Sequence, residues 1–95
     1  MAVVLGPEAI EDQDRIVEEY LEHAPTLALR FLDETRAVYE RLDGHPRAYQ
    51  IQYDDVRRAL LETLPYAIFH AETQGDVYVL RVLHVRADPR SWLGG

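Results

Sequence analysis

The 95-residue chain carries 17 acidic residues against 10 arginines and no lysine, so its formal net charge is −7. A chain of this length forms one domain with one modest core, and we expect residues 1–95 to be a single domain. The absence of cysteine excludes a disulfide framework and a thiolate metal site. No apolar stretch approaches the roughly 18 residues that are needed to cross a bilayer. The amino-terminal residues also lack the basic segment that is typical of a signal peptide. We therefore expect a cytoplasmic protein without a membrane partner.

The negative charge lies in the first half of the chain. Residues 1–44 contain four arginines and eleven acidic residues, whereas residues 45–95 contain six of each. Proteins that bind nucleic acid on their own usually carry a basic surface, because contacts to phosphate dominate the affinity. The sequence therefore predicts no tight independent binding to RNA or DNA.

The first half has the pattern of a short strand followed by two helices. The apolar run at residues 2–5 ends at Gly6-Pro7, and proline is favoured at the first position of a helix. Apolar residues then recur at helical spacing up to Pro25, which ends the first helix and can start a second one that closes at Asp43-Gly44. Two helices with so short a joint form an antiparallel hairpin.

The first helix carries a dense acidic run from Glu8 to Glu22. We interpret it as a solvated helix face, the common outcome for charged residues on an amphipathic helix. The alternatives are a cation site and a docking surface for a basic partner. The side chains assigned to this outer face are those of Glu11, Asp12, Asp14, Glu18, Glu19 and Glu22.

The second half contains three short β-type runs. The first ends before Leu64-Pro65, and the second and third flank Thr73-Gln74-Gly75-Asp76. Residues 49–53 precede the first run and fit either an extension of it or a loop. We therefore predict an α+β fold: an N-terminal strand, a two-helix hairpin and a three-stranded antiparallel meander, with the helices packed on one sheet face.

A turn centred on Gln74-Gly75 pairs residues whose numbers sum to 149. Both resulting faces are largely apolar, so the hairpin can cover one and a second chain, either a partner or another copy, can shield the other. Phe69, Leu80 and Val82 are expected to pack together on one face. The predicted pairs are Phe69 with Leu80, Ala67 with Val82 and Ile68 with Arg81.

His84 and Arg86 are two residues apart and are expected to project from the same face at the end of the last strand, near Asp88-Pro89 and Trp92. In a ribonuclease, His84 would act as general acid or base, Arg86 would stabilise the phosphorane and Trp92 would stack a base. The alternative is structural: His84 and Arg86 bond to Asp88 and neighbouring carbonyls, and Trp92 packs as a lid. The remaining histidines are scattered, so no zinc site is predicted.

Arg57 and Arg58 are adjacent on the first strand of the meander and must point to opposite faces. We expect one of them to form an ion pair with Asp54, Asp55 or Asp88, which leaves the other free to meet a partner.

Four short motifs follow one another in the second half of the chain: Val56-Arg57-Arg58, Leu64-Pro65-Tyr66-Ala67-Ile68, Val79-Leu80-Arg81-Val82-Leu83-His84, and Arg86-x-Asp88-Pro89 with Trp92. In their order and spacing they resemble the carboxy-terminal signature of the RelE/ParE toxin superfamily. The first half is similar, more weakly, to the strand and two helices of that family through Gly6-Pro7-Glu8-Ala9 and Arg30-Phe31-Leu32.

The resemblance implies the toxin of a type II toxin–antitoxin, or plasmid stabilisation, module that needs no cofactor. It also implies a cognate antitoxin, small and with an acidic tail that folds against the toxin. The likeness is closer to the ParE-like branch, whose implied target is DNA gyrase and which inhibits it by protein–protein contact. Antitoxin or target binding is assigned to Arg57, Arg58, Leu80, Arg81, Val82, Arg86, Arg90 and Trp92.

Two rival functions stay open. Ribosome-dependent mRNA endoribonucleases of the RelE kind resemble one another in a basic array, and here no lysine is present and Ala67 follows Tyr66. This departure favours a protein that is not an enzyme. A degenerate, non-toxic member of the family is the other rival, since Glu62-Thr63-Leu64 stands where relatives often have arginine and Leu93-Gly94-Gly95 replaces a basic tail.

Overall fold

The computed structural model describes residues 2–88 and 90–93 and has an α+β fold. Helices α1 (Pro7–His23) and α2 (Pro25–Gly44) follow a three-residue strand β1 (Val3–Leu5). A short 3₁₀ turn, η1 (Pro46–Ala48), leads to strands β2 (Gln50–Tyr53), β3 (Val56–Leu60), β4 (Tyr66–Thr73) and β5 (Asp76–His84). The chain continues to a four-residue helix, α3 (Arg90–Leu93). Pro89, which is part of the family-like motif, lies outside the described residues. So do Gly94 and Gly95, which belong to the segment that replaces the basic tail of relatives.

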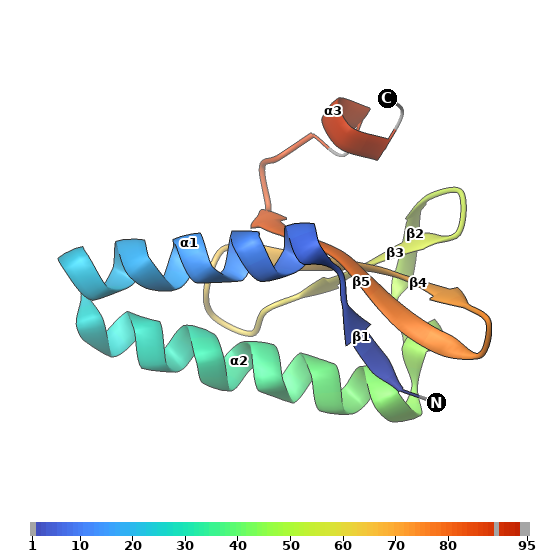
Figure 1. The fold of residues 1–95 in the computed structure, drawn as a ribbon, viewed down its shortest axis with the longest axis horizontal. Helices are drawn as coiled ribbons and strands as arrows, with labels where there is room; N and C mark the ends of the chain where they lie inside the picture. The colour runs from blue at the N-terminus through green and yellow to red at the C-terminus, as the bar shows by residue number, and fades with distance from the viewer. Residues whose placement is uncertain (1, 89, 94–95) are drawn as a thin grey trace.

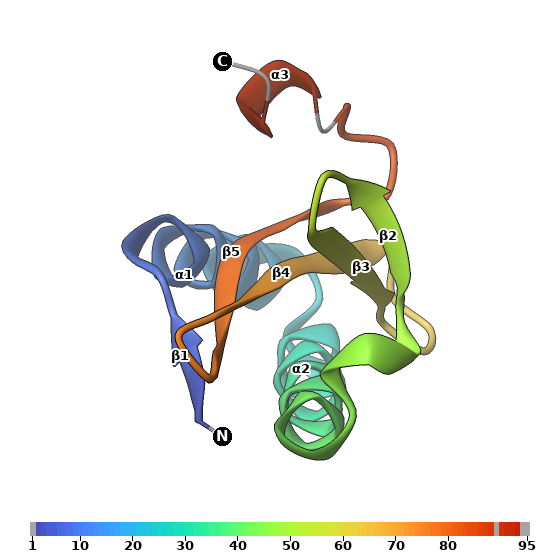
Figure 2. The ribbon, with the colours of Figure 1, turned by 90° about the vertical axis from the view of Figure 1, so that its right-hand side faces the viewer.

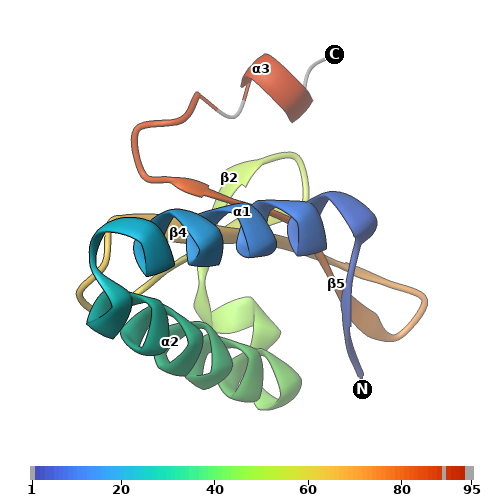
Figure 3. The same ribbon diagram turned by 60° about the vertical axis from the view of Figure 1, so that its left-hand side comes forward.

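The predicted fold class and helical hairpin are confirmed, but the sheet has five strands, because β1 and β2 both join the predicted three-stranded meander. Its order is β1-β5-β4-β3-β2, and β1 runs parallel to β5 while the other neighbours are antiparallel. The segment whose character the sequence left open is strand β2, which pairs with β3. The helices lie side by side as an antiparallel pair, with α1 beside β5 and α2 below α1 in the views of Figures 1 and 3.

The helix boundaries follow from local chemistry. Each helix begins at a proline whose fixed φ suits the first turn, and only Ala24 separates the two helices. Gly6 stands between β1 and α1, and a Cβ atom there would lie 2.6 Å from the Tyr78 hydroxyl. A larger residue at this position would therefore require the Tyr78 side chain to move. None of the helices in the described ranges combines the length and the apolar composition needed to span a bilayer.

The turn between β4 and β5 is the predicted one, with positive φ at Gln74 (51°) and Gly75 (85°). Such a two-residue turn matches the twist of the strands on either side. The 149 pairing holds from the turn to His70, which lies opposite Val79. Beyond that point the register changes, because Leu80 is an extra residue on β5.

This β-bulge at Leu80 makes the predicted pairing wrong in the second half of the hairpin. A one-residue insertion turns every later side chain to the other face. Val82 therefore packs on the helix side, away from Phe69 and Leu80. The observed pairs are Phe69 with Arg81, Ile68 with Val82 and Ala67 with Leu83.

The two sides of the sheet carry separate apolar clusters. The larger lies between the sheet and the helical hairpin, and the smaller lies on the opposite side, beneath α3 (Figure 2). Buried members of the larger cluster are Ala9, Ile16, Phe31, Val38, Leu42, Ala59, Leu61, Leu64, Ile68, Val77, Val79 and Val82. The smaller cluster contains buried Val56, Ala67 and Phe69, with half-buried Ala71, Leu80, Leu83 and Trp92 packed against them.

Candidate functional site

The sheet side opposite α1 and α2 is the candidate functional site, and we call it the open face. It consists of the smaller apolar cluster and of the side chains on its rim. Alternation along β3 puts Arg58 and Leu60 on the same side as Val56, and Leu60 is 51% exposed. Tyr53, opposite Val56 on β2, is 42% exposed. The open face is therefore an apolar centre with exposed apolar and cationic neighbours.

Trp92 is the main cover of this cluster. Its ring meets Phe69 edge-on, with ring centroids 5.2 Å apart, and the guanidinium of Arg81 lies 5.7 Å from its ring centroid. The Trp92 Nε1 atom is buried without a hydrogen-bond partner in the described structure. Beside Trp92, a groove of about 450 Å³ is lined by Glu8, Tyr78, Leu80, Arg81 and Trp92. Of the structural alternative, the packing of Trp92 as a lid is observed, but the Asp88 carboxylate bonds to Arg90 and not to His84 or Arg86 in the described residues.

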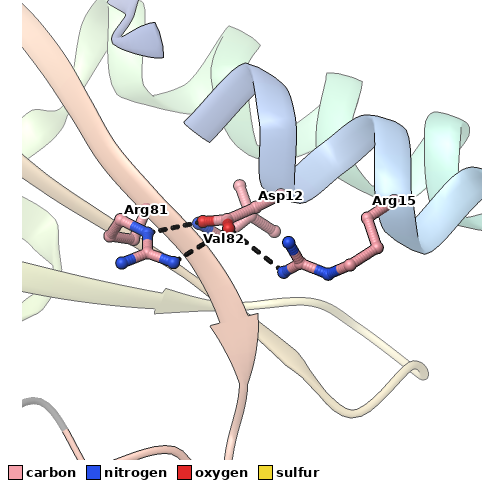
Figure 4. Close-up of polar contacts among 4 residues, drawn as sticks. All are labelled: Asp12, Arg15, Arg81 and Val82. Atoms are coloured by element: carbon pink, nitrogen blue, oxygen red, sulfur yellow. Dashed lines mark hydrogen bonds and ion pairs between the residues drawn. The ribbon is translucent and has the colours of Figure 1, made fainter. Parts of the chain in front are cut away.

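Arg81 is held from the other side by Asp12 of α1. The Arg81 Nε and Nη2 atoms donate to the Asp12 carboxylate at 2.7 and 2.9 Å, and the backbone N–H of Val82 donates to Asp12 Oδ2 at 3.0 Å (Figure 4). Arg15 adds a contact of 3.1 Å. Burial alone would raise the pKa of the Asp12 carboxyl, but the hydrogen bonds that it accepts hold this pKa below its ordinary value.

Asp12 is needed because β1 is short. The last sheet bond on this edge runs from the Gly6 N–H to the Val79 carbonyl, after which the chain turns away into α1. The N–H of Val82 therefore has no strand beside it, and the Asp12 carboxylate takes that place. This contact joins residues 70 positions apart and fixes α1 against the edge of β5.

The assignment of Asp12 to the solvated outer face was wrong, since its side chain is only 2% exposed. The sequence does contain a signal for this. Asp12 is three residues after Ala9 and four before Ile16, both of which are buried, so the three share one helix face. Conversely, Ile10 and Leu21 are apolar residues of the same helix, and they are 46% and 56% exposed.

The structure separates the residues assigned to binding. Leu80, Arg58 and Trp92 belong to the open face, and Arg86 is exposed in the turn between β5 and α3. Val82 is fully buried under the helices, so its side chain cannot line a binding surface.

The other three assigned arginines have partners within the chain. Arg81 is tied to Asp12, and Arg90 pairs with Asp88 at 3.1 Å. Arg57 donates to the Tyr49 carbonyl at 2.6 Å, and in the described structure neither Arg57 nor Arg58 forms the predicted ion pair with an aspartate.

His84, Arg86 and Trp92 do not converge on one point. The His84 ring packs edge-on against Tyr66, which belongs to the helix-side cluster, whereas Trp92 packs on Phe69 on the open face. Arg86 lies in the turn after β5 rather than on the strand, and its backbone N–H donates to His84 Nδ1 at 3.1 Å. The expectation that His84 and Arg86 project together from a strand is therefore wrong.

His70 is a buried polar residue on the helix side. Its side chain is 1% exposed, its ring meets Tyr49 edge-on at 5.6 Å, and its Nε2 atom has no partner in the described part of the chain. Burial, and then the nearby Arg57 charge, lower the pKa of His70 to about 4. His70 is therefore neutral at pH 7. No cluster of three or more His, Cys, Asp or Glu side chains within residues 2–88 and 90–93 is arranged to hold a metal ion.

Comparison with known proteins gives a family and a structural relative. Residues 3–89 match the family model described as the ParE toxin of type II toxin–antitoxin systems, parDE. A solved structure of the chromosomal ParDE toxin–antitoxin system from P. aeruginosa is similar in fold, with a TM-score of 0.78 and 20% sequence identity. That likeness covers 88% of this chain and 95% of the other. No curated protein matches the sequence.

Proposed function

Because the chain belongs to the ParE toxin family of type II toxin–antitoxin systems, we propose that it inhibits a protein target by direct contact and is neutralised by an antitoxin on the open face. The family match supports the toxin assignment. The observation that supports the location is the small apolar cluster of the open face, which is covered chiefly by one residue of a four-residue helix. A binding partner can bury more of this surface than the chain buries alone.

The chemistry of the rim favours an acidic amphipathic antitoxin segment. Arg58 brings positive charge to the open face, Arg86 is exposed in the turn that leads from β5 to α3, and Leu60 and Leu80 offer apolar contacts. A segment with apolar residues on one side and carboxylates on the other would satisfy both. The guanidinium of Arg81 is already paired with Asp12, so Arg81 is not proposed as a direct contact of the antitoxin. It acts indirectly, because it lies against the Trp92 ring that covers the open face.

Inhibition by contact is favoured over RNA cleavage. A nuclease of this kind needs its proton-transfer group and its base-stacking ring at one site, and here His84 and Trp92 pack on opposite sides of the sheet. The net charge of −7 also opposes binding to a phosphate backbone. DNA gyrase, implied by the ParE-like resemblance, is the proposed target, and the cytoplasm is the proposed location.

Expression of the chain alone, and together with the adjacent reading frame, tests the function. We expect growth arrest with a DNA damage response, relieved by the neighbouring product. Arrest accompanied by mRNA cleavage would support the ribonuclease instead. Growth without arrest, from a protein shown to be folded and present, would support the degenerate family member.

A thermal-shift experiment with the antitoxin tail tests the location. The peptide should raise the melting temperature of the wild-type chain, and Leu80→Gln or Arg86→Ala should reduce that increase. Leu29→Gln is the matched control, since Leu29 is 67% exposed on the helical hairpin. An equal loss in the control and in the open-face variants would place the antitoxin elsewhere.

A further inference from the structure

A second group of exposed apolar residues lies on the helical hairpin. Its main members are Ile10 and Leu21 of α1 and Leu29 of α2, which are 46%, 56% and 67% exposed. Single exposed apolar residues are ordinary on protein surfaces, whereas a contiguous group is typical of an interaction site. The question is whether these three side chains belong to one surface.

Helical geometry puts them on one surface. Ile10 and Leu21 are eleven residues apart, close to three helical turns, so they lie on one side of α1, with exposed Asp14 and half-buried Val17 between them. Tyr39 of α2 donates its hydroxyl proton to Gln13 Oε1 at 2.8 Å, which fixes how the two helices face each other. Leu32 and Arg36, from the same side of α2 as Leu29, line a groove of about 250 Å³ between the helices together with Gln13, Thr35 and Tyr39. We call this groove and its neighbouring apolar side chains the hairpin stripe.

The charges beside the hairpin stripe indicate what kind of partner fits it. The hairpin, residues 7–44, holds eleven acidic residues and four arginines, so it carries the whole net charge of −7. Asp14, Glu18 and Glu22 follow one another at four-residue intervals next to the stripe. Like charges at that spacing destabilise a helix. In the described structure none of the three has an ion-pair partner.

From these observations we infer that the hairpin stripe binds an amphipathic helix with basic flanks that belongs to another protein. Its apolar side chains would enter the groove between α1 and α2, and its Lys or Arg residues would meet the acidic row of α1. A second copy of this chain fits poorly, because it would set one hairpin of charge −7 against another. This surface is separate from the open face, so the inference does not depend on where an antitoxin binds.

The test measures binding of three synthetic peptides to the folded chain by fluorescence anisotropy. One is a helical peptide of Leu and Lys in an amphipathic pattern, the second has the same composition in scrambled order, and the third replaces Lys by Glu. We expect the patterned basic peptide to bind at least about tenfold more tightly than either of the others. Equal binding of the scrambled peptide would show attraction by net charge alone and would overturn the inference.

Variants locate the contact. The double substitution Leu21→Gln with Leu29→Gln should lower the affinity for the patterned peptide about tenfold. The substitution Leu60→Gln, on the open face, should leave that affinity unchanged. Thermal melts of each variant confirm that the fold is intact. Unchanged binding by the Leu21/Leu29 variant would contradict the proposal. A concentration-dependent dimer that the same variant abolishes would also contradict it, because the hairpin stripe would then bind a second copy of this chain.

A second pair of variants separates local from global charge. Asp14→Asn with Glu18→Gln removes two charges beside the stripe, and Asp55→Asn with Glu62→Gln removes two exposed charges outside the hairpin. Only the first pair of substitutions should weaken binding of the patterned peptide. Raising the salt concentration from about 50 to about 300 mM should reduce the difference in affinity between the two pairs. Equal effects of the two pairs would contradict a specific contact.

Discussion

The helix-covered face and the open face share strands β3, β4 and β5 but differ in how they are closed. In the described structure the helix side buries twelve apolar residues in one cluster, and the open face buries three. Two long amphipathic helices supply the first cover, and a helix of four residues supplies the second. Apolar burial drives folding in rough proportion to area, so the helix side should hold most of the stability, and the open face should be able to change its cover.

The same contrast holds for two Asp–Arg pairs. Asp12 and Arg81 are 69 positions apart, and the carboxylate is almost fully buried. Asp88 and Arg90 are neighbours in sequence, with side chains that are 52% and 82% exposed. A buried pair that also satisfies a backbone N–H fixes two elements against each other, whereas an exposed pair contributes little. The pair that holds the fold therefore lies at the helix side.

The largest expected effect is the loss of an aromatic ring from the helix side. Phe31 is fully buried and lies 5.6 Å from Tyr66 and 6.3 Å from Tyr20 between ring centroids. Phe31→Ala should lower the free energy of unfolding by about 4 kcal/mol, measured by urea denaturation. Phe69→Ala on the open face should cost about 3 kcal/mol, since Trp92 can move into the space left. A larger loss for Phe69 would reverse the comparison.

Removal of the Asp12 carboxylate should cost nearly as much. Asp12→Ala leaves the Val82 N–H and the Arg81 guanidinium without their acceptor, and we expect a loss of about 3 kcal/mol in urea denaturation. Asp12→Asn keeps an acceptor for Val82 and should lose less. Asp14→Ala, an exposed neighbour on the same helix, is the control. If Asp12→Ala and Asp14→Ala unfold at the same urea concentration, then α1 is held by apolar contacts alone.

The pH dependence of stability should distinguish the buried titrating groups. The folded pKa of His70, about 4, is below the ordinary 6.5, so the neutral form is favoured in the folded state. Stability is therefore complete above pH 6.5 and is lost as pH falls toward 4, by on the order of 2 to 3 kcal/mol. The depressed pKa of Asp12 adds a further loss at lower pH, as its carboxylate is protonated. Chemical denaturation of His70→Phe should show a flatter profile between pH 6.5 and 4, and an unaltered profile would exclude His70 as the cause.

The smallest effect is expected for the cover of the open face. Trp92→Ala removes a half-buried ring on a short helix and should cost only about 1 kcal/mol. It should at the same time increase the binding of a hydrophobic dye, because Phe69 and Leu80 lose their neighbour. Leu60→Ala, whose side chain is already exposed, serves as the comparison. A cost above about 3 kcal/mol would mean that α3 is a fixed part of the core.

The open face shows the limit of a register derived from a turn. The turn at Gln74-Gly75 was predicted correctly because glycine at positive φ is a local signal, and the pairing near it followed. The bulge at Leu80 has no such signal. It lies where Arg81 turns to Asp12 and Trp92, two contacts that the local sequence does not specify. Val82 was consequently placed on the wrong face.

The sequence by itself determined the elements whose limits rest on local chemistry. A proline marks the start of each long helix, and a glycine marks the end of the first strand. Hydrophobic periodicity predicts the helical hairpin and the strands of the meander. The order of the short motifs also indicated the toxin family, which the family model over residues 3–89 confirms.

Only the tertiary structure decided which charged residues are buried and which are free. Asp12 has the same local character as its acidic neighbours, and only the unpaired edge of β5 gives it a backbone N–H and an arginine to bind. The parallel pairing of β1 with β5 is likewise a contact between distant segments. These contacts depend on where β1 ends and the chain enters α1. Asp12 and Val82 are 70 positions apart in the sequence, and only the complete fold brings them together.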